Sequence, residues 1–294
     1  MISYSDISII IPAKNEANNL SSFLPKLASQ CKDSEIIVIN DGSEDDTEEV
    51  CKKHGVKVIT HPYSKGNGAA IKTGARAATR KVIICMDGDG QHQPSDIPRL
   101  MQEYDKGYAM VVGARSKKSQ ANFARAIANG IYNTLASWMT EQTVLDLTSG
   151  FRIVNAKKFR EFLYLLPNGF SYPTTITMAF FRAGYSVNYL PIVALKREGN
   201  SHISLSKDGV RFLLIIFKVG TLYSPLKLFF PLSLMHAVLG LSYYCYTYFA
   251  FHRFTNMSTV LFTTSIIIFL IGLISEQITL LVYKETSSPY NKNN

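Results

Sequence analysis

Cysteine is scarce in this sequence and nowhere paired. The 294-residue chain has four cysteines, Cys31, Cys51, Cys85 and Cys245, and none of them forms a CxxC pair. This spacing excludes a zinc site built on paired thiolates, and a disulfide framework would need a denser set of cysteines. We therefore expect reduced thiols that serve packing.

Several nucleotide-binding and nucleic-acid-binding signatures are also missing. The chain has no GxxxxGK[ST] phosphate loop. No GxGxxG follows its first strand-like run, which argues against a nicotinamide or flavin cofactor. The net charge of +9 is not gathered in an Arg/Lys-rich arm, so we expect no nucleic-acid partner. The charge instead suits an anionic membrane surface or phosphorylated substrates.

The first two thirds of the chain alternate apolar, β-branched runs with helical patterns. This alternation predicts βαβ units and a mostly parallel, Rossmann-like α/β sheet. Pro12 is expected to end the first strand. Ligands of such sheets bind beyond the carboxyl ends of the strands, so acidic turns at those ends should meet in one cleft. The expected strands cover residues 7–11, 36–39, 56–59, 82–86 and 109–112.

The last third of the chain contains two long apolar runs. Residues 229–251 and 259–283 each exceed the roughly 20 residues that cross a bilayer, and their short link predicts a transmembrane hairpin. The basic, amphipathic segment before them is typical of helices in a membrane interface. Pro225 and Pro231 are expected to break that segment into pieces. The alternative interpretation is a buried hairpin of a soluble protein.

The distribution of charge predicts the orientation of this hairpin. Basic residues flank its outer ends, whereas only Arg253 marks the link, so both ends should face the cytoplasm. No basic n-region precedes the first strand, so we expect no signal peptide and a cytosolic N-terminal domain. Glu276 lies near the cytoplasmic end of the second run, where it can reach the interface. The expected division is a catalytic domain, interfacial helices, hairpin and polar tail at 1–205, 206–228, 229–284 and 285–294.

The turn Asp87-Gly88-Asp89 follows the strand expected at 82–86. Two carboxylates separated by one residue can share a divalent cation, and hard oxygen ligands suit Mg²⁺ or Mn²⁺. Gln91 and His92 add possible ligands. A cation here would offset the charge of a departing diphosphate. The alternative is an acidic surface turn.

Three other positions are candidates for ligand contacts. Asp41 ends the second strand, where its carboxylate can bind a base or ribose, or cap a turn. Glu16 has the same two interpretations, as a ligand contact or as a first-turn helix residue. Lys65 lies in the segment SKGNGAAIKTG, which resembles a phosphate-binding helix N-terminus; a plain loop is the alternative.

An ordered set of motifs carries a family resemblance. The segments IPAKNE, INDGSEDDT, SKGNGAAIKTGA, DGDGQH and DLTSGFR occur in this order. Together they resemble family 2 glycosyltransferases of the GT-A fold, in the branch of dolichyl-phosphate mannose synthase and bacterial polyprenyl-phosphate glycosyltransferases. The resemblance covers about residues 7–230 and continues more loosely into the hairpin.

The resemblance implies roles for particular residues. The nucleotide-sugar would contact the first strand end, the Asp41 turn and the metal turn. Asp89 and Asp146 would be catalytic-site acids, and basic residues would lie near the donor and acceptor phosphates. The implied nucleotide-sugar ligands are Pro12, Glu16, Asp41, Lys65, Asp87, Gly88 and Asp89; the metal ligands are Asp87, Asp89 and Gln91; the acceptor or phosphate ligands are Arg115, Arg125, Arg197 and His202.

Two positions depart from the family pattern. Many relatives carry Asp where this chain has Asn40, which can hydrogen-bond but adds no charge. Relatives often carry lysine where this chain has His202, and a neutral histidine binds phosphate more weakly.

The implied reaction is inverting, metal-dependent transfer of a sugar from a nucleotide-sugar to a polyprenyl phosphate at the cytoplasmic membrane face. A UDP-sugar is favoured as donor, with GDP-mannose as the alternative, and a homo-oligomer is possible. Other interpretations are transfer to a hydroxyl or lipid-linked sugar, and a non-catalytic membrane-tethered scaffold. A processive synthase is disfavoured because the surroundings of Trp138 do not match QxxRW.

Overall fold

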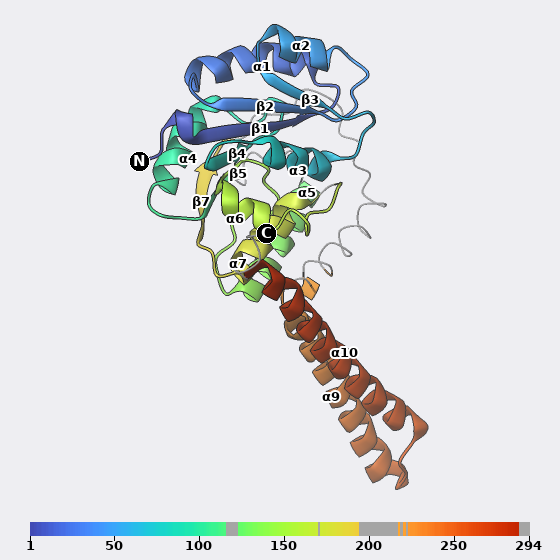
Figure 1. The fold of residues 1–294 in the computed structure, drawn as a ribbon. Coiled ribbons are helices and arrows are strands. Elements are labelled where there is room, and N and C mark those ends of the chain that lie inside the picture. Colours follow the sequence, from blue (N-terminus) through green and yellow to red (C-terminus); the bar gives the residue numbers. More distant parts are fainter. Residues whose placement is uncertain (116–122, 170, 194–216, 218–219, 222, 288–294) are drawn as a thin grey trace. The chain divides into compact units, whose positions relative to one another are not determined.

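The computed structural model describes residues 1–115, 123–169, 171–193, 217, 220–221 and 223–287, with side chains omitted at 123–129 and 284–287. The chain divides into two compact units, Met1–Ser204 and Leu205–Asn294 (Figure 1). The first unit is an α/β domain and the second a helical hairpin.

The α/β unit alternates strands and helices, as the sequence patterns predict. Its strands are β1 (Ile7–Ala13), β2 (Glu35–Asn40), β3 (Lys57–Thr60), β4 (Val82–Cys85), β5 (Met110–Arg115), β6 (Arg152–Asn155) and β7 (Val187–Ile192). Its helices are η1 (Tyr4–Asp6), α1 (Ala17–Gln30), α2 (Thr47–Lys53), α3 (Asn67–Ala77), η2 (Pro94–Asp96), α4 (Ile97–Tyr104), α5 (Phe123–Thr140), α6 (Ala156–Glu161) and α7 (Tyr172–Arg182). The first five strands lie within a few residues of the expected ones, and β6 and β7 were not predicted.

The strand β1 is the centre of the hydrophobic core. Ile7, Ile9 and Ile11 alternate along it and pack with apolar residues of α1 and α4 on one face of the sheet. Ile10 points to the other face, where Gly74 of α3 lies against it. Figure 1 shows α1 and α2 on one side of the sheet and α3 on the other. Burial on both faces explains the uninterrupted apolar run, and each buried isoleucine contributes about 1.5–3 kcal/mol.

The seven strands form one sheet in the order β3-β2-β1-β4-β6-β5-β7. All pairings are parallel except those of β6, which runs antiparallel to β4 and β5. The mostly parallel α/β fold is therefore confirmed. Because β6 is reversed, its first residue lies at the same edge as the carboxyl ends of β4 and β5.

Pro12 does not end β1, contrary to the expectation. The strand continues to Ala13, and Pro12 stands opposite Ile39 in the register with β2. The carbonyl of Ile10 accepts the N–H of Met86 on the β4 side, so the nitrogen two residues later faces that same side. There β4 has ended at Cys85, and the missing N–H of proline leaves no partner unpaired.

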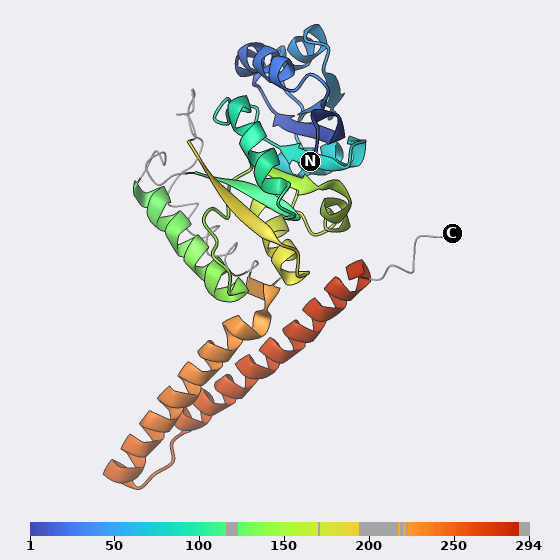
Figure 2. The same cartoon turned by 90° about the vertical axis from the view of Figure 1, so that its left-hand side faces the viewer.

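The second unit contains α9 (Pro225–Phe251) and α10 (Asn256–Ser287), which form the predicted antiparallel hairpin (Figure 2). Both helices are long and apolar enough to cross a membrane. Within the most apolar windows of α9 and α10, only 11% and 17% of residues are buried. A core hairpin of a soluble protein would instead bury most of these side chains.

Pro225 and Pro231 differ in their effect on the helices: helical residues 220–221 and 223 are separated from α9 by the non-helical Ser224, so a helix boundary falls at Pro225 as expected. Pro225 is at the start of α9, where its missing N–H costs nothing. Pro231 lies inside α9 and the helix continues through it, contrary to the expectation. α9 contacts α10 on both sides of this position, through Phe229 beside Gly272 and through Ser233 bonded to Ser265, and contacts between neighbouring helices let membrane helices tolerate an internal proline.

Small residues at intervals of seven line the contact between the two helices. The sets are Ser233, Gly240 and Thr247 on α9, and Ser258, Ser265, Gly272 and Thr279 on α10, all buried. The hydroxyls of Ser233 and Ser265 each donate to the other residue's carbonyl, at 2.9 and 2.8 Å. Small side chains let apolar helices approach closely, and the spacing of seven keeps the seam facing the partner.

Glu276 of α10 supplies a cap for α9. Ser224, at the N-terminus of α9, makes no side-chain cap of its own. The Glu276 carboxylate accepts the Leu226 N–H at 3.2 Å and the Ser224 hydroxyl at 3.3 Å. A carboxylate at this end satisfies an otherwise unpaired amide and complements the helix dipole. Its position at the outer end of the hairpin agrees with the sequence expectation.

Replacing Gly272 by leucine should loosen the hairpin. A Cβ atom on Gly272 would lie 2.7 Å from Cβ of Phe229, so a larger side chain must push the helices apart. We expect the full chain in detergent to unfold at a lower temperature, because its free energy of unfolding falls by about 1–3 kcal/mol. Ile271→Leu, on an exposed neighbouring position, is the matched control. Equal behaviour of the two variants would contradict the seam.

Candidate functional site

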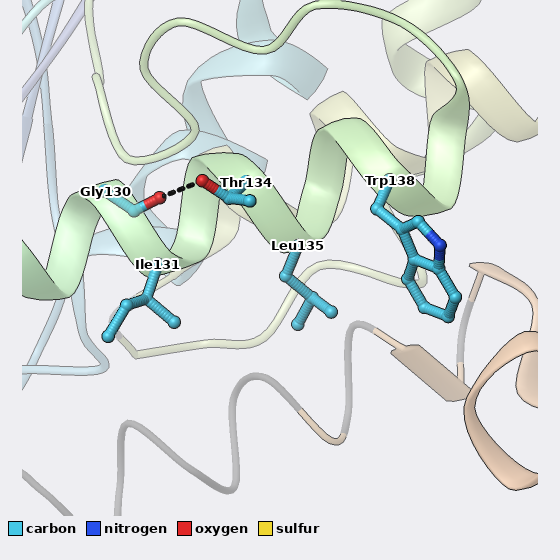
Figure 3. A pocket seen from close by; sticks show the side chains of 5 residues that line it. All are labelled: Gly130, Ile131, Thr134, Leu135 and Trp138. Carbon is cyan, nitrogen blue, oxygen red and sulfur yellow. Dashed lines mark hydrogen bonds between the residues drawn. The ribbon is translucent and has the colours of Figure 1, made fainter. Parts of the chain in front are cut away.

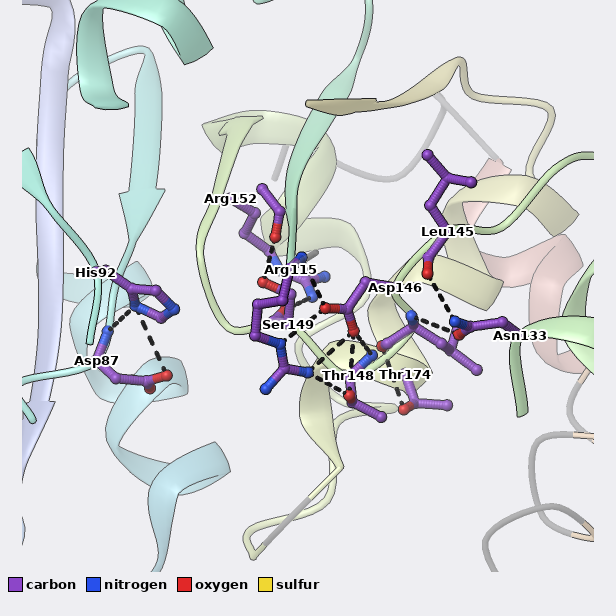
Figure 4. Close-up of polar contacts among 12 residues, drawn as sticks. Asp87, His92, Arg115, Asn133, Leu145, Asp146, Thr148, Ser149, Arg152 and Thr174 are labelled. Atoms are coloured by element: carbon purple, nitrogen blue, oxygen red, sulfur yellow. Dashed lines mark hydrogen bonds and ion pairs between the residues drawn. The ribbon is translucent and has the colours of Figure 1, made fainter. Parts of the chain in front are cut away.

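Acidic and basic side chains gather at the edge where β4 and β5 end and β6 begins. Asp87 follows β4 by two residues, Arg115 is the last residue of β5, and Asp146 belongs to the loop before β6. Arg152, the first residue of β6, stands opposite both Cys85 of β4 and Val112 of β5. The reversed strand thus brings the DLTSGFR motif beside the DGDGQH motif (Figure 4).

The Asp87 side chain rests against a glycine of the neighbouring loop. A Cβ atom on Gly150 would lie 2.8 Å from Oδ2 of Asp87, so only glycine leaves room for this carboxylate. Gly88 is less tightly enclosed on the other side, where its Cβ would lie 3.3 Å from the Pro12 carbonyl oxygen. The turn is therefore held between β1 and the Gly150 loop.

His92 supports this turn from inside. It is buried, its ring stacks on Phe151 with centroids 5.0 Å apart, and its Nδ1 accepts the Asp87 N–H at 3.2 Å. Burial lowers the pKa of His92 to about 4, so the ring is neutral at physiological pH. With Nδ1 already occupied by a backbone amide, His92 acts as a support for the turn rather than as the metal ligand considered from the sequence.

The turn fits a divalent cation that is shared with a substrate. The Asp87 side chain is 31% exposed, and Asp89 is partly exposed with Oδ1 accepting the Gln91 N–H at 3.2 Å. Among the described residues, no cluster of three His, Cys, Asp or Glu side chains is placed to hold a metal alone. Two carboxylates with remaining positions for phosphate and water match the usual coordination of magnesium.

Arg115 and Asp146 form a two-pronged ion pair. Nε and Nη2 of Arg115 donate to the two carboxylate oxygens at 2.8 and 3.0 Å, and the Arg115 N–H donates at 3.1 Å. Thr148 adds its N–H and hydroxyl to the same carboxylate, each at 3.1 Å. Burial alone would raise the pKa of Asp146, but the hydrogen bonds and charge of Arg115 hold it below its usual value. Asp146 is therefore an ionised, fully engaged carboxylate.

Sequence reasoning assigned no role to Arg152, which holds the loop between the two acidic groups. Its guanidinium is fully buried and donates to the Ser149 carbonyl, to the Pro173 carbonyl at 3.2 Å and to the Thr177 hydroxyl at 3.1 Å. It also lies 5.7 Å from the ring centre of Tyr172, whose hydroxyl donates to the Gly150 carbonyl at 3.3 Å. The sequence feature that could have indicated a role for Arg152 is its position in the DLTSGFR motif.

Asp41 organises the segment that follows β3. It is buried and accepts hydrogen bonds from the His61 ring at 2.7 Å, the Ser64 hydroxyl at 2.9 Å and the Lys65 and Gly66 amides at 2.9 and 2.8 Å. Burial opposes its ionisation, but these hydrogen bonds lower the pKa of Asp41. The carboxylate thus shapes the loop, and a direct contact with a base stays a prediction.

The expected phosphate cradle at the start of α3 is filled by the protein itself. The amides of Gly68 and Ala69 donate to the carbonyls of Gly169 and Asn168, at 3.2 and 2.9 Å. With the Lys65 and Gly66 amides bound to Asp41, four amides of this segment are already engaged. This packing agrees with the alternative of a plain loop, and a contact of Lys65 with the nucleotide-sugar stays a prediction. Lys65 keeps an exposed side chain, with its ammonium 5.6 Å from the Tyr63 ring centre.

Glu16 and Pro12 lie where the first strand leads into α1. Glu16 precedes the first residue of α1, and its carboxylate accepts the Asn19 side-chain amide at 2.5 Å. Asn40 accepts the Ser43 N–H at 3.0 Å and so shapes the turn after β2. These residues lie at the edge of the sheet where the parallel strands β1 and β2 end. Their contacts with a nucleotide stay predictions.

Three residues predicted to contact phosphate lie outside the part of the chain whose side chains the structure describes. Arg125 lies in α5 at a position where side chains are not described, and Arg197 and His202 fall outside the described residues. Their roles stay predictions.

Comparison with known proteins identifies the family. Residues 8–163 match the model of glycosyl transferase family 2. The chain belongs to this family. Residues 224–281 match the GtrB C-terminal hairpin, which covers α9 and most of α10. The resemblance read from the sequence motifs is thus confirmed.

Two relatives show how far this family 2 glycosyltransferase resembles others. It is 27% identical to CsbB of Bacillus subtilis over 308 residues, covering 97% of this chain and 90% of CsbB. It is 26% identical to the dolichyl-phosphate hexose transferase of Haloferax volcanii, covering 74% of this chain and 94% of that protein.

The α/β unit also resembles solved structures. Glucosyl-3-phosphoglycerate synthase from Mycobacterium tuberculosis, in complex with Mn²⁺, UDP and product, superposes with a TM-score of 0.58. The match is 19% identical and covers 73% of this chain and 78% of that one. At this identity the likeness establishes the fold, a GT-A-like α/β domain.

Replacing Gly150 by alanine should displace the Asp87 carboxylate. The added Cβ would overlap Oδ2 of Asp87, and a shift of about 1 Å at a catalytic group can cost about 100-fold in rate. We expect a large loss of glycosyltransferase activity with little change in unfolding temperature. Gly169→Ala is the matched control, because no atom of the residues that the structure describes, apart from its chain neighbours, lies within 4 Å of a Cβ there. Full activity of Gly150→Ala would contradict this role.

Replacing Asp146 by asparagine should leave Arg115 without its counter-charge. Removing one partner of a buried pair costs on the order of 3 kcal/mol, so both the unfolding temperature and transfer should fall. Because the pKa of Asp146 is lowered, the pair stabilises the fold above the unfolded-state pKa and is lost as pH falls below about 4. In the wild type, part of the fall in unfolding temperature across this acid range comes from protonation of Asp146. We expect that part of the fall to be missing in the variant. An unchanged acid profile would contradict the assignment.

Proposed function

We propose that the protein transfers a sugar from a nucleotide-sugar to a polyprenyl phosphate at a membrane surface. The observation that carries the proposal is that Asp87 and Asp89 lie at the same edge of the sheet as the Arg115–Asp146 ion pair. The same chain also carries an apolar hairpin. The family match and the name of the Haloferax volcanii relative support the reaction class.

The donor is held by its diphosphate at the Asp87–Asp89 turn. A divalent cation, Mg²⁺ or Mn²⁺, would neutralise charge on the departing nucleoside diphosphate when bound there. Gly150 leaves room for the Asp87 carboxylate, and the Asp87 N–H donates to the His92 ring. Gln91 is proposed as an additional metal ligand. A UDP-sugar is the favoured donor, with GDP-mannose as the alternative.

The chemical step is a direct displacement. An oxygen of the acceptor phosphate forms a bond to the anomeric carbon while the bond to the diphosphate oxygen breaks, which inverts the configuration. A lipid phosphate is already an anion, so no side chain has to remove a proton. This agrees with the state of Asp146, whose carboxylate is occupied by Arg115 and Thr148 and has a lowered pKa. Asp146 therefore orients Arg115 rather than acting as a base.

Arg115 is proposed to contact the phosphates. Its side chain is 26% exposed while that of Asp146 is 4% exposed, so the guanidinium reaches the surface of the site and the carboxylate stays behind it. Guanidinium groups match phosphate oxygens well, and the ion pair fixes this one in orientation. Arg125, Arg197 and His202 are proposed as further phosphate contacts on the strength of the sequence alone.

The observed state of Asp146 also weighs against a hydroxyl acceptor. A hydroxyl would need a general base within hydrogen-bond reach and with a suitable pKa. Asp146, engaged on both oxygens, is poorly suited to that task. The hairpin would anchor the protein as an integral membrane protein, with the catalytic domain on the cytoplasmic face and lipid partners at its surface. A homo-oligomer is compatible with this arrangement.

Labelled sugar transfer by the full chain in detergent tests the proposal. The protein is incubated with Mn²⁺ or Mg²⁺, undecaprenyl phosphate and a panel of radiolabelled UDP- and GDP-sugars. Labelled lipid from one donor, lost on chelation with EDTA, is the expected result. Asp89→Ala should abolish transfer, whereas Asp33→Ala, an exposed surface acid, should not. Metal-dependent nucleotide binding without labelled lipid from any donor would favour the scaffold or another acceptor.

A further inference from the structure

The chain between α6 and α7 is held on α3 by a lysine outside the proposed reacting groups. The ammonium of Lys72 donates to the Leu166 carbonyl at 3.1 Å and to the side-chain oxygen of Asn168. Both acceptors belong to residues 166–169, named here the 166–169 loop. We propose that Lys72 is a positioning residue for the proposed sugar transfer, and that it acts through this loop on the Asp87 turn.

Two glycines at the start of α3 let the loop lie against the helix. A Cβ atom on Gly68 would overlap the Pro167 carbonyl oxygen, and one on Gly66 would lie 2.6 Å from the Asn168 carbonyl oxygen. Neither position therefore accepts a side chain unless the loop backbone moves. Because Lys72 is one helical turn beyond Gly68, it meets the loop on the same side of α3. The glycines thus allow the close approach, and the lysine adds hydrogen bonds to it.

The 166–169 loop leads into α7, whose first residue supports the site. Tyr172 is buried, and its hydroxyl donates to the Gly150 carbonyl at 3.3 Å. Gly150 in turn leaves room for the Asp87 carboxylate. Ser171, directly before α7, has a left-handed φ of 85°, a conformation that persists in a serine only when the surrounding structure holds it. A shift of the loop should therefore be passed on to Tyr172 and Gly150.

The contacts of Asp41, which is predicted to bind the nucleotide, do not involve the Lys72 side chain. Asp41 pairs with one ring nitrogen of His61 at 2.7 Å, and the other ring nitrogen lies 2.9 Å from the Thr73 hydroxyl of α3. Loss of the Lys72 ammonium should leave these bonds in place. The rate of the chemical step should therefore fall, whereas the affinity for the donor should change little.

Replacing Lys72 by methionine removes the ammonium but keeps a side chain of similar length. For the full chain in detergent, we expect kcat of sugar transfer to fall about tenfold or more, because a small displacement of a catalytic group is costly. The KM for the nucleotide-sugar should change by less than about threefold, since the Asp41 contacts remain. Lys72→Arg, which keeps a cationic donor, should retain most of the wild-type kcat. Lys26→Met, at an exposed position of α1, is the matched control.

Three kinetic outcomes would overturn the proposal. One is equal kcat in Lys72→Met and Lys26→Met. Another is a fall in kcat with an equally large rise in KM, because donor binding rather than the Asp87 turn would then be affected. The third is a Lys72→Arg variant as slow as Lys72→Met, since the ammonium would then not be the group that matters.

The exposed side of α5 provides an internal reference for a second measurement, amide hydrogen exchange. The residues drawn in Figure 3 line a shallow depression on this side. The Thr134 hydroxyl donates to the Gly130 carbonyl at 2.9 Å, within the same helix. Among the contacts of the described residues, none joins Lys72 to this stretch. Exchange at 130–138 should therefore be the same in Lys72→Met and in the wild type.

Hydrogen exchange distinguishes this inference from the proposed function, on which its kinetic test rests. Amides of the 166–169 loop and of residues 147–152 should exchange about fivefold faster in Lys72→Met than in Lys26→Met. Faster exchange in the loop alone, or an equal increase that includes 130–138, would overturn the proposal. If the wild type transfers no sugar, the proposed function fails, and the exchange pattern still decides whether Lys72 supports the site.

Discussion

The reversed strand β6 is the constraint on which the site depends. A strand antiparallel to β4 and β5 begins at the edge where those strands end, and its first residue, Arg152, stands opposite both. The buried guanidinium then fixes the preceding loop through the Ser149 and Pro173 carbonyls. No acceptor among the described residues reaches its Nε, so the site tolerates an imperfectly satisfied cation in its interior. Leaving this buried N–H without an acceptor costs about 1–3 kcal/mol. The ring of Tyr172 and the hydrogen bonds of the rest of the guanidinium offset this cost.

The same loop gives two carboxylates, Asp87 and Asp146, different surroundings. Asp87 is partly exposed in the turn that is proposed to bind the metal and diphosphate, whereas Asp146 is buried and paired with Arg115. Asp87 lies against Gly150, whereas Asp146 accepts hydrogen bonds from the Arg115 guanidinium and from Thr148. Such a division suits an acceptor that is already an anion. It is also the reason that the structure favours phosphate over a hydroxyl as the proposed acceptor.

Close approach at small residues recurs in both units. Gly150 lets Asp87 lie against its loop, and Gly272 lets Phe229 approach α10 in the hairpin. In the α/β unit the approach positions a reactive group, whereas in the hairpin it replaces the hydrophobic driving force that lipid surroundings would remove.

The sequence alone was enough for the α/β fold, the hairpin and the family, because hydrophobic periodicity and ordered motifs are local properties. Strand runs such as 7–11 are recognisable from side chains that are buried on both faces. The sequence could not predict β6, since four residues in a loop-like context carry little periodic signal. It also could not foresee that the amides of Lys65, Gly66, Gly68 and Ala69 would be occupied, or that Asp146 would pair with Arg115. Those outcomes depend on contacts between residues as much as 101 positions apart, which only the tertiary structure decides.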